Sequence, residues 1–371
     1  MQAIGFDILQ NISQALFLSG LLILLTIGLN MIYSVMKFSN FAHAEWVTFG
    51  MYIGWWGLQL LYFWIPWDNN FLINNIFVHA MFAFVMVGLF GILGEILIYS
   101  RLRNTKAGPT SFVVASIGIG LIVRNLLSMI FSETAYRRGT FGGRCPNCTQ
   151  DANLPGFFPS FLHNDVYEFV LFNNDSFFGT QSILITKYEF FIIILAIVMV
   201  FAVDFLFRRT KFGIAMRATS DSRELAQISG INTKRIVLYT WFIAGGITGF
   251  GATFYRANLP KFDSFTGFLL LLPIFAVVIL GGVGSFRGGI IAALIYGFVR
   301  QAFFIILTEF QKDGGIEDML SNIEIIPGVV FPGITFHPSY ADAIGFVILI
   351  LVLLFRPQGI SGKVEATRAR V

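Results

Sequence analysis

The chain has 371 residues, of which 56% are hydrophobic and 12% charged, whereas soluble domains average about 45–50% and about 25%. This composition argues against a water-soluble enzyme. The formal net charge of +4 is too small to indicate a nucleic-acid partner, and the two cysteines exclude a disulfide framework or a four-cysteine zinc site. We therefore expect a chain with no catalytic residues, no cofactor and no bound metal.

Nine hydrophobic segments follow one another along the chain, and most approach the roughly 20 residues that cross a bilayer as a helix. They lie at Leu16–Tyr33, Phe41–Trp64, Ile76–Tyr99, Phe112–Phe131, Phe190–Phe207, Ile236–Phe254, Phe268–Val283, Ile290–Leu307 and Ala341–Phe355. We predict an all-α polytopic transmembrane helix bundle of about eight to ten membrane segments. Residues 1–371 then form one transmembrane domain in the cell membrane.

The connections between these segments differ in charge, which predicts their side of the membrane. Basic residues cluster after the third and fifth segments and again after the last one, and the positive-inside rule places all three clusters in the cytoplasm. Strict alternation then puts the N-terminus outside. It also makes residues 132–187 an extracellular insertion, which contains Cys145 and Cys148; a local disulfide or free thiols are both compatible with their spacing.

The first interruption of the hydrophobic pattern contains three polar side chains. Asn40, His43 and Glu45 stand between the first two segments. Such groups are costly in hydrocarbon and usually face a protein interior or a wet pathway. Ser39 or Asn40 is a candidate cap for a helix that starts at Phe41. The alternative is an interfacial turn that touches lipid headgroups and water.

A glycine cluster interrupts the pattern again near the end of the chain. Five glycines occur within Gly281–Gly289, a density that ordinary helix interiors do not contain. We predict a flexible linker opposite the first interruption, formed by Gly281, Gly282, Gly284, Ser285 and Gly288. The alternative is a short cytoplasmic hairpin between two helices.

Two broken segments far apart in the chain are typical of transporters whose interrupted helices meet at the binding region. Arg124, in the fourth segment, is a charge at membrane depth. It is a candidate pathway group, although pairing with a buried carbonyl or carboxylate explains it equally well.

The cytoplasmic stretch 208–235 combines basic residues with apolar ones near helical spacing. Its centre, Ala215–Gly230, predicts a short amphipathic helix with Gly230 as the glycine stop. Such a helix fits lipid headgroups or a groove on a partner protein. Charge alone does not separate these two possibilities.

Five motifs resemble the family of LivH-type branched-chain amino acid ABC transporter permeases, which also includes urea and short-amide permeases. The order and spacing of the motifs hold from about residue 12 to residue 308. The matching stretches are IYSVMKFSNFAHAE (Ile32–Glu45), SIGIGLIVRNL (Ser116–Leu126), GIAMRA with ELAQISGI (within Gly213–Ile231), VVILGGVGS (Val277–Ser285) and RPQG (Arg356–Gly359).

The sequence departs from the family pattern at three of these positions. Arg124 stands where the family generally has Gln, Ala44 where it has Gly, and Arg287 where Pro or Trp is commoner. The external insertion is also longer than usual. These differences bear on the substrate more than on the fold.

The resemblance implies a set of partners. They are a second, LivM-like permease, two cytoplasmic ATP-binding subunits and an extracellular solute-binding protein. The resemblance also makes 208–235 a coupling-helix segment, in which Arg217, Glu224 and Gly230 would transmit the motion of the ATP-binding subunits. The chain itself has no phosphate-binding Gly-x-x-x-x-Gly-Lys-Ser/Thr loop, so ATP would be hydrolysed on the partner subunits.

We therefore expect a non-enzymatic permease subunit of an ABC importer for branched-chain amino acids. A permease for urea or short-chain amides is the first alternative. A stand-alone urea or ammonia channel, or a secondary transporter, would account for His43 and Arg124 without a motor, but neither gives a reason for the cytoplasmic helix.

Overall fold

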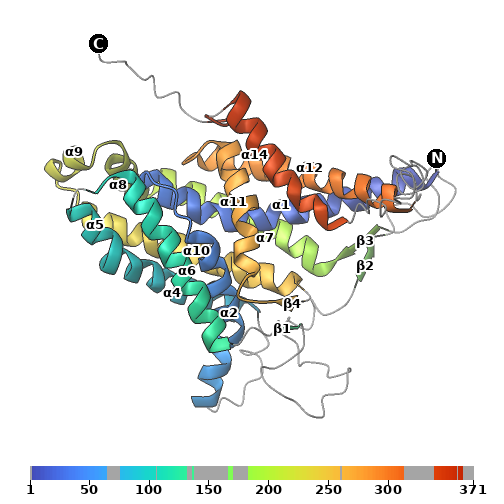
Figure 1. Ribbon diagram of the computed structural model, residues 1–371, viewed down its shortest axis with the longest axis horizontal. Coiled ribbons are helices and arrows are strands. Elements are labelled where there is room, and N and C mark those ends of the chain that lie inside the picture. The colour runs from blue at the N-terminus through green and yellow to red at the C-terminus, as the bar shows by residue number, and fades with distance from the viewer. Residues whose placement is uncertain are drawn as a thin grey trace, which may run out of the picture.

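The computed structural model is a helical membrane bundle (Figure 1). The structure describes residues 2–64, 76–105, 107–131, 136–137, 166–169, 183–259, 261–312, 338–356 and 358–361. Its helices are α1 (Gln2–Met36), α2 (His43–Trp64), α4 (Ile76–Gly94), the π-helical turn η1 (Glu95–Tyr99), α5 (Ser100–Asn104), α6 (Pro109–Phe131), α7 (Lys187–Arg209), α8 (Lys211–Asp221), α9 (Arg223–Ile228), α10 (Thr233–Asn258), α11 (Thr266–Gly281), α12 (Phe286–Lys312), the 3₁₀ turn η3 (Pro338–Ala343) and α14 (Ile344–Phe355). Each of the nine predicted hydrophobic segments contains a helix, so the all-α prediction is confirmed.

Six helices of the described chain are long and apolar enough to cross a membrane: parts of α1, α4 with α5, α6, α7, α10 and α12. The helices α11 and α14 are apolar but shorter. The most hydrophobic stretch of α1 is 89% buried, whereas that of α7 is 22% buried. The bundle is therefore built around α1 and α10, and α4, α6, α7 and α12 expose apolar faces suited to lipid or to another membrane subunit.

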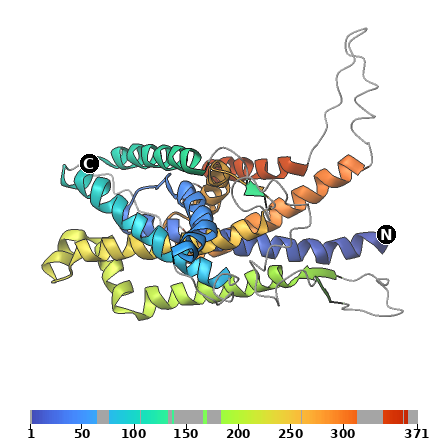
Figure 2. The same cartoon turned by 90° about the horizontal axis from the view of Figure 1, so that it is seen from below.

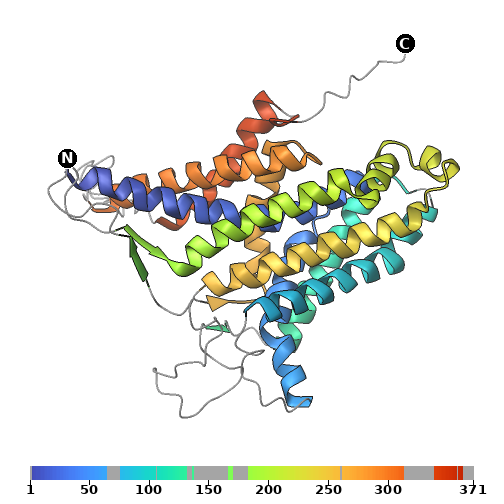
Figure 3. The same ribbon diagram turned by 180° about the vertical axis from the view of Figure 1, so that it is seen from behind.

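The helices follow two directions. α1, α4, α7, α10 and α12 run along the long axis of the molecule, whereas α2 and α11 cross it steeply (Figure 3). The view from below shows the same layers, with α6 on the side opposite α7 (Figure 2).

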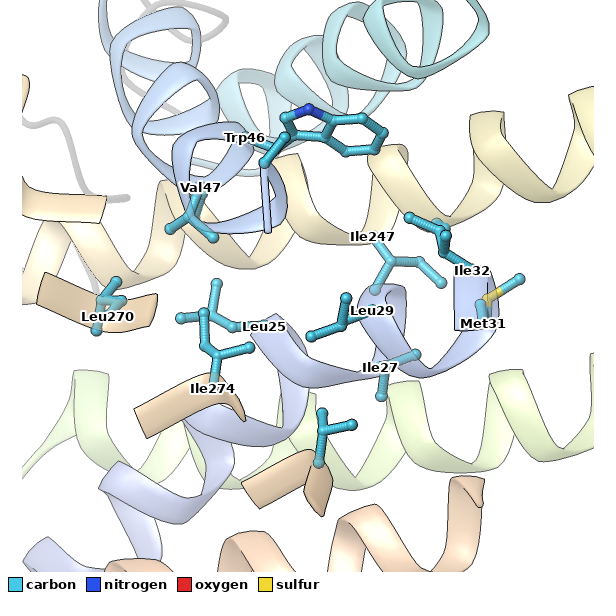
Figure 4. Close-up of a cluster of buried hydrophobic side chains, with 14 of the residues drawn as sticks. Leu25, Ile27, Leu29, Met31, Ile32, Trp46, Val47, Ile247, Leu270 and Ile274 are labelled. Carbon is cyan, nitrogen blue, oxygen red and sulfur yellow. The ribbon is translucent and has the colours of Figure 1, made fainter. Parts of the chain in front are cut away.

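The centre of the bundle is closely packed aliphatic side chains. Leu25 and Leu29 of α1 face Ile247 of α10 and residues of α2 and α11 in one buried cluster (Figure 4). α1 approaches α10 closely at Gly28, where an added Cβ would lie 2.6 Å from the Ala244 carbonyl. Dense packing of this kind fixes how the steeply crossing helices meet the bundle.

The chain breaks its helical course between α1 and α2, as the sequence predicts, but α2 begins at His43 and not at Phe41. The reason lies in how Asn40 caps the chain. Its side-chain Oδ1 accepts from the Ala42 N–H at 3.2 Å and its carbonyl from the His43 N–H at 3.2 Å, which forms a turn before the helix. The Ser116 hydroxyl of α6 accepts from the Phe41 N–H at 3.0 Å. Irregular backbone at membrane depth is thus satisfied by protein groups.

Short strands occur at the end that carries the N-terminus. β1 (Tyr136–Arg137) pairs antiparallel with β4 (Lys261–Phe262), and β2 (Val166–Phe169) with β3 (Ile183–Thr186). Apart from β1, β2, β3 and the start of α7, the predicted insertion 132–187 lies outside the described residues, as do Cys145 and Cys148.

The opposite end carries α5, α8 and α9 (Figure 1). The basic clusters after the third and fifth hydrophobic segments lie at this end, which is the cytoplasmic end by the positive-inside rule.

Candidate functional site

An ion pair between α2 and α6 is the most unusual polar feature inside the bundle. Arg124 Nε donates to Glu45 Oε1 at 2.9 Å, and Arg124 Nη2 donates to the same oxygen. Glu45 Oε2 takes no part in the ion pair, and the Thr48 hydroxyl, three residues further along α2, interacts with the same carboxylate. The guanidinium thus uses one carboxylate oxygen only.

Two aromatic rings of the loop and helix that follow β4 hold the guanidinium from the other side. The Arg124 Cζ atom lies 4.2 Å from the ring centre of Phe268 and 4.9 Å from that of Phe265. Cation–π contacts of this geometry stabilise a desolvated guanidinium. The arginine is therefore fixed by a carboxylate and by two rings.

A cavity of about 200 Å³ lies beside the ion pair. Apart from Glu45 and Arg124, its wall is apolar or backbone: Phe41, Ala44, Ile117, Gly120, Leu121, Phe268 and Leu271. Ile117, Leu121 and Phe268 are also exposed at the surface of the bundle. The cavity is therefore reached from the outer face of α6 and α11.

The site lies inside the span of α6, about two thirds of the way along the helix. Arg124 follows Pro109, the first residue of α6, by 15 residues, or about 22 Å of helix, and Phe131 ends the helix about 10 Å further on. Glu45 lies in the first turn of α2, where the helix dipole favours a negative charge. A helix that starts at this depth is the arrangement that transporters use at their binding sites.

The structure separates the three polar residues that the sequence grouped together. Glu45 lines the cavity, whereas His43 is fully buried between α1 and α10 and its Nε2 lies 2.8 Å from the Leu25 carbonyl. Asn40 is fully buried at the helix break, where its Oδ1 also accepts from the Tyr99 hydroxyl at 3.3 Å. In this state of the molecule His43 and Asn40 hold helices together and do not reach the cavity.

The glycine cluster forms a tight hairpin between α11 and α12. Gly282 and Gly284 have φ angles of 93° and 81°, which glycine adopts without strain. Where α11 and α12 cross, a Cβ on Gly281 would lie 2.5 Å from the Gly288 carbonyl carbon. Ser285 caps α12 by accepting from the Gly288 N–H at 3.1 Å. This arrangement matches the hairpin alternative, because the cluster lies at the cytoplasmic end of α11, some ten residues or about 15 Å beyond the cavity.

The hairpin is tied directly to α1 and to the segment after α14, and through α1 to α8. The Gly284 N–H donates to Asn30 Oδ1 at 3.2 Å, and the Ser34 hydroxyl donates to the Gly284 carbonyl at 3.2 Å, so α1 holds the turn. The Ser220 hydroxyl of α8 donates to the Ser34 carbonyl at 2.5 Å. Beyond α14, the Ile360 N–H donates to the Leu280 carbonyl at 2.8 Å. The cytoplasmic helices, the glycine hairpin and the RPQG stretch therefore meet in one place.

The predicted cytoplasmic helix is two helices and not one, which corrects the prediction of a continuous helix over 215–230. Ser222 is extended and its hydroxyl accepts from the Leu225 N–H at 3.3 Å, so it ends α8 and caps α9. Gly230 has a φ of 84°, and the Ile231 N–H donates to the Ala226 carbonyl at 2.9 Å. This is the glycine-terminated helix end predicted for that position.

The candidate coupling residues lie on this two-helix unit. Arg217 on α8 and Glu224 on α9 are exposed. The apolar side chains Leu225 and Ile228 are 63% and 84% exposed outside the span of any membrane helix. Burial lowers the pKa of the Arg223 guanidinium, which lies on the same unit. An apolar and charged surface that projects from the bundle is suited to docking a partner.

Sequence reasoning did not anticipate several contacts. One is the contact of the Phe265 and Phe268 rings with Arg124, and another is the pair of hydrogen bonds that joins Ser34 to Gly284 and to Ser220. These residues look ordinary in a membrane segment. Ser116 carried a usable signal, because a polar residue inside the SIGIG motif needs a hydrogen-bond partner at membrane depth. Within the described residues, His, Cys, Asp and Glu side chains do not gather into a group of three able to hold a metal.

Comparison with known proteins places the chain in a family. Residues 11–353 match the family model described as branched-chain amino acid transport system / permease component. The chain is 25% identical to the high-affinity branched-chain amino acid transport system permease protein LivH of Escherichia coli K12, with 97% of each chain covered. It is 23% identical to the corresponding BraD protein of Pseudomonas aeruginosa, with 98% of each covered.

A shorter similarity reaches sugar permeases. The chain is 30% identical over 115 residues to the fructose import permease protein FruF of Bifidobacterium longum, which covers 29% of this chain and 32% of that protein. No solved structure matches the chain. With its membrane-spanning helices and a family match over nearly its whole length, the chain is a multi-pass membrane protein that belongs to the permease component family of branched-chain amino acid transport systems.

Proposed function

We propose that this chain is the membrane permease of an ATP-driven importer for branched-chain amino acids. It works with a second, LivM-like permease, two cytoplasmic ATP-binding subunits and an extracellular solute-binding protein. The permease names of LivH and BraD support the substrate class, since both align with this chain over almost its full length. Those relatives give no support to the urea permease or to the channel.

One observation carries the motor-driven part of the proposal. The unit formed by α8 and α9 projects at the cytoplasmic end and exposes Leu225 and Ile228 to water. Exposing apolar side chains costs about 25 cal/mol per Å² relative to burying them, so a partner surface is the natural cover. A passive channel has no use for such a unit.

The unit is also connected to the bundle in a way that suits transmission. Ser220 of α8 contacts the end of α1 at Ser34, and Ser34 contacts the glycine hairpin at Gly284. Displacement of α8 by an ATP-binding subunit would therefore act on the ends of α1, α11 and α12 together. Partner binding then shifts the equilibrium between two arrangements of the spans.

The test is ATP hydrolysis and uptake by the reconstituted complex. Leu225→Asp and Ile228→Asp place charges on the docking surface and leave the membrane spans unchanged. Both variants should insert normally, bind the ATP-binding subunits less tightly and lose leucine-stimulated ATP hydrolysis. Arg101→Asp, an exposed change on α5 at the same end but outside this unit, is the control and should retain stimulation.

The channel alternative makes the opposite prediction. Proteoliposomes that contain this chain without ATP-binding subunits would then conduct substrate, and neither substitution would change the flux. Such a result would refute the importer proposal.

A further inference from the structure

The Glu45–Arg124 ion pair has the features of a site and not only of a structural link. It borders a cavity that opens on the outer face of α6 and α11, where the partner permease can cover it, and both hydrogen bonds from Arg124 fall on one carboxylate oxygen. Phe268 also contacts the guanidinium, so the Arg124 side chain has a contact besides Glu45.

We propose that a zwitterionic amino acid binds by inserting into this ion pair. Its carboxylate replaces Glu45 at the Arg124 guanidinium, its ammonium group replaces Arg124 at the Glu45 carboxylate, and its aliphatic side chain occupies the apolar cavity. This inference rests on the proposed function and deepens it, because it names the groups that contact the substrate.

Charge balance is the first argument. One buried ion pair becomes two ion pairs that share the same two protein charges, so no charge is left uncompensated. Separating a buried pair without replacement is strongly unfavourable. An α-amino acid carries both required charges on neighbouring groups, which lets it bridge two side chains that are already in contact.

The cavity supplies the second argument. Ile117, Leu121 and Leu271 give it an aliphatic wall, and its volume of about 200 Å³ is below the ~300–1,000 Å³ of pockets for drug-sized ligands. The site therefore suits one small solute with an aliphatic side chain. A permease site must bind its substrate and then release it. When the substrate's ion pairs replace a protein ion pair of similar strength, both binding and release are possible.

Neutral and singly charged solutes fit this site poorly. Urea and short amides carry no formal charge, so they cannot replace either ionic partner. A carboxylate without an ammonium group would leave the Glu45 carboxylate without a counter-ion. An amine without a carboxylate would leave the Arg124 guanidinium without one, in contact only with the rings of Phe265 and Phe268. The ion pair would thus act as a selectivity filter for zwitterions.

A cysteine-protection assay on the purified complex of the full chain with its partner permease and ATP-binding subunits tests the proposal. In a background without the two native cysteines, Leu121→Cys places a thiol in the cavity wall. L-leucine at about ten times its dissociation constant should slow maleimide labelling about tenfold, because only the unoccupied fraction reacts. Isoamylamine, 4-methylpentanoate and urea should protect far less.

Three controls make the assay specific. Met129→Cys, exposed on the same helix outside the cavity, should label at a rate that leucine does not change. The double variant Glu45→Gln/Arg124→Gln should keep its subunits but lose leucine protection. The single variant Glu45→Gln frees the guanidinium and should shift protection from leucine to 4-methylpentanoate, a change that a purely structural role would not produce.

Each contrary result overturns the proposal. Equal protection by urea, protection that persists in the double variant, or a thiol at position 121 that never reacts would each show that the cavity is not a zwitterion site. Leucine-stimulated ATP hydrolysis of the unmodified complex, measured in the same preparation, keeps the two proposals apart. Its absence refutes the importer function, whereas its presence alongside any of these results refutes only the ion-pair site.

Discussion

Replacing Arg124 should destabilise the protein by several kcal/mol, because it separates a buried ion pair. The Glu45 side chain is 3% exposed and that of Arg124 is 17% exposed, so Arg124→Gln leaves a nearly dry carboxylate without its counter-ion. Loss of one partner of a buried pair costs about 3–5 kcal/mol. Glu45→Gln should cost less, about 1.5–3 kcal/mol, because two rings still hold the guanidinium.

The double variant is expected to be more stable than the sum of the two losses predicts. Removing both charges leaves two amides that can hydrogen-bond to each other, so the coupling energy should fall near the upper part of the ~0.5–3 kcal/mol found for contacting residues. Equilibrium unfolding in mixed detergent micelles, followed by tryptophan fluorescence, measures the free energy of unfolding of each single variant and of the double variant relative to the unmodified protein.

A second ion pair is the matched control. Arg300 Nε donates to Asp342 Oδ1 at 2.7 Å, but this aspartate is exposed at the end of the bundle. Asp342→Asn should cost no more than about 1 kcal/mol. If the losses for Glu45 and Arg124 add within about 0.5 kcal/mol, the two residues are not coupled in the native protein and the reasoning on their pairing is wrong.

Three further predictions concern the cytoplasmic end. Gly288→Ala should lower the yield of folded protein sharply, as measured by size-exclusion chromatography, because its Cβ would enter the Gly281 carbonyl group at the α11–α12 crossing; a normal yield would show that the crossing is looser. Gly230→Val should destabilise the end of α9 by about 1–2 kcal/mol and reduce affinity for the ATP-binding subunits, although no atom lies near enough to clash; unchanged affinity would remove α9 from the interface. In a background without native cysteines, Ser222→Cys should react with an impermeant thiol reagent only from the cytoplasm, and Asp342→Cys only from outside. Labelling of Ser222→Cys from outside and of Asp342→Cys from the cytoplasm would show that the topology is inverted.

The membrane helices were predictable because hydrophobicity is a local signal. A run of apolar residues must be helical in hydrocarbon whatever it packs against, so all nine segments could be located from composition and length alone. Helix ends were less predictable. The start of α2 at His43 depends on the side-chain turn of Asn40 and on Ser116, which is 75 residues away along the chain.

The site was predictable in its members but not in its geometry. Glu45 and Arg124 were both candidates because charges are rare at membrane depth, yet their contact spans 79 residues and depends on how α2 crosses α6. His43 satisfied the same criterion but lies in the core. A polar residue at membrane depth must have a partner, but the sequence does not indicate whether that partner is the substrate or another part of the protein. The glycines likewise showed that backbones approach closely without showing where.

The cavity and the cytoplasmic unit are joined by one helix. α11 contributes Phe268 and Leu271 to the cavity near its start, and at its end Leu280 accepts a hydrogen bond from the segment after α14. Pro273 lies between the two, where it removes one helical hydrogen bond and gives α11 a place to bend. A displacement of α8 reaches this helix through Ser34 and the glycine hairpin. Because Phe268 holds the Arg124 guanidinium, movement of α11 changes how firmly that guanidinium is held beside Glu45, which is the connection that a motor-driven permease needs between ATP hydrolysis and its binding site.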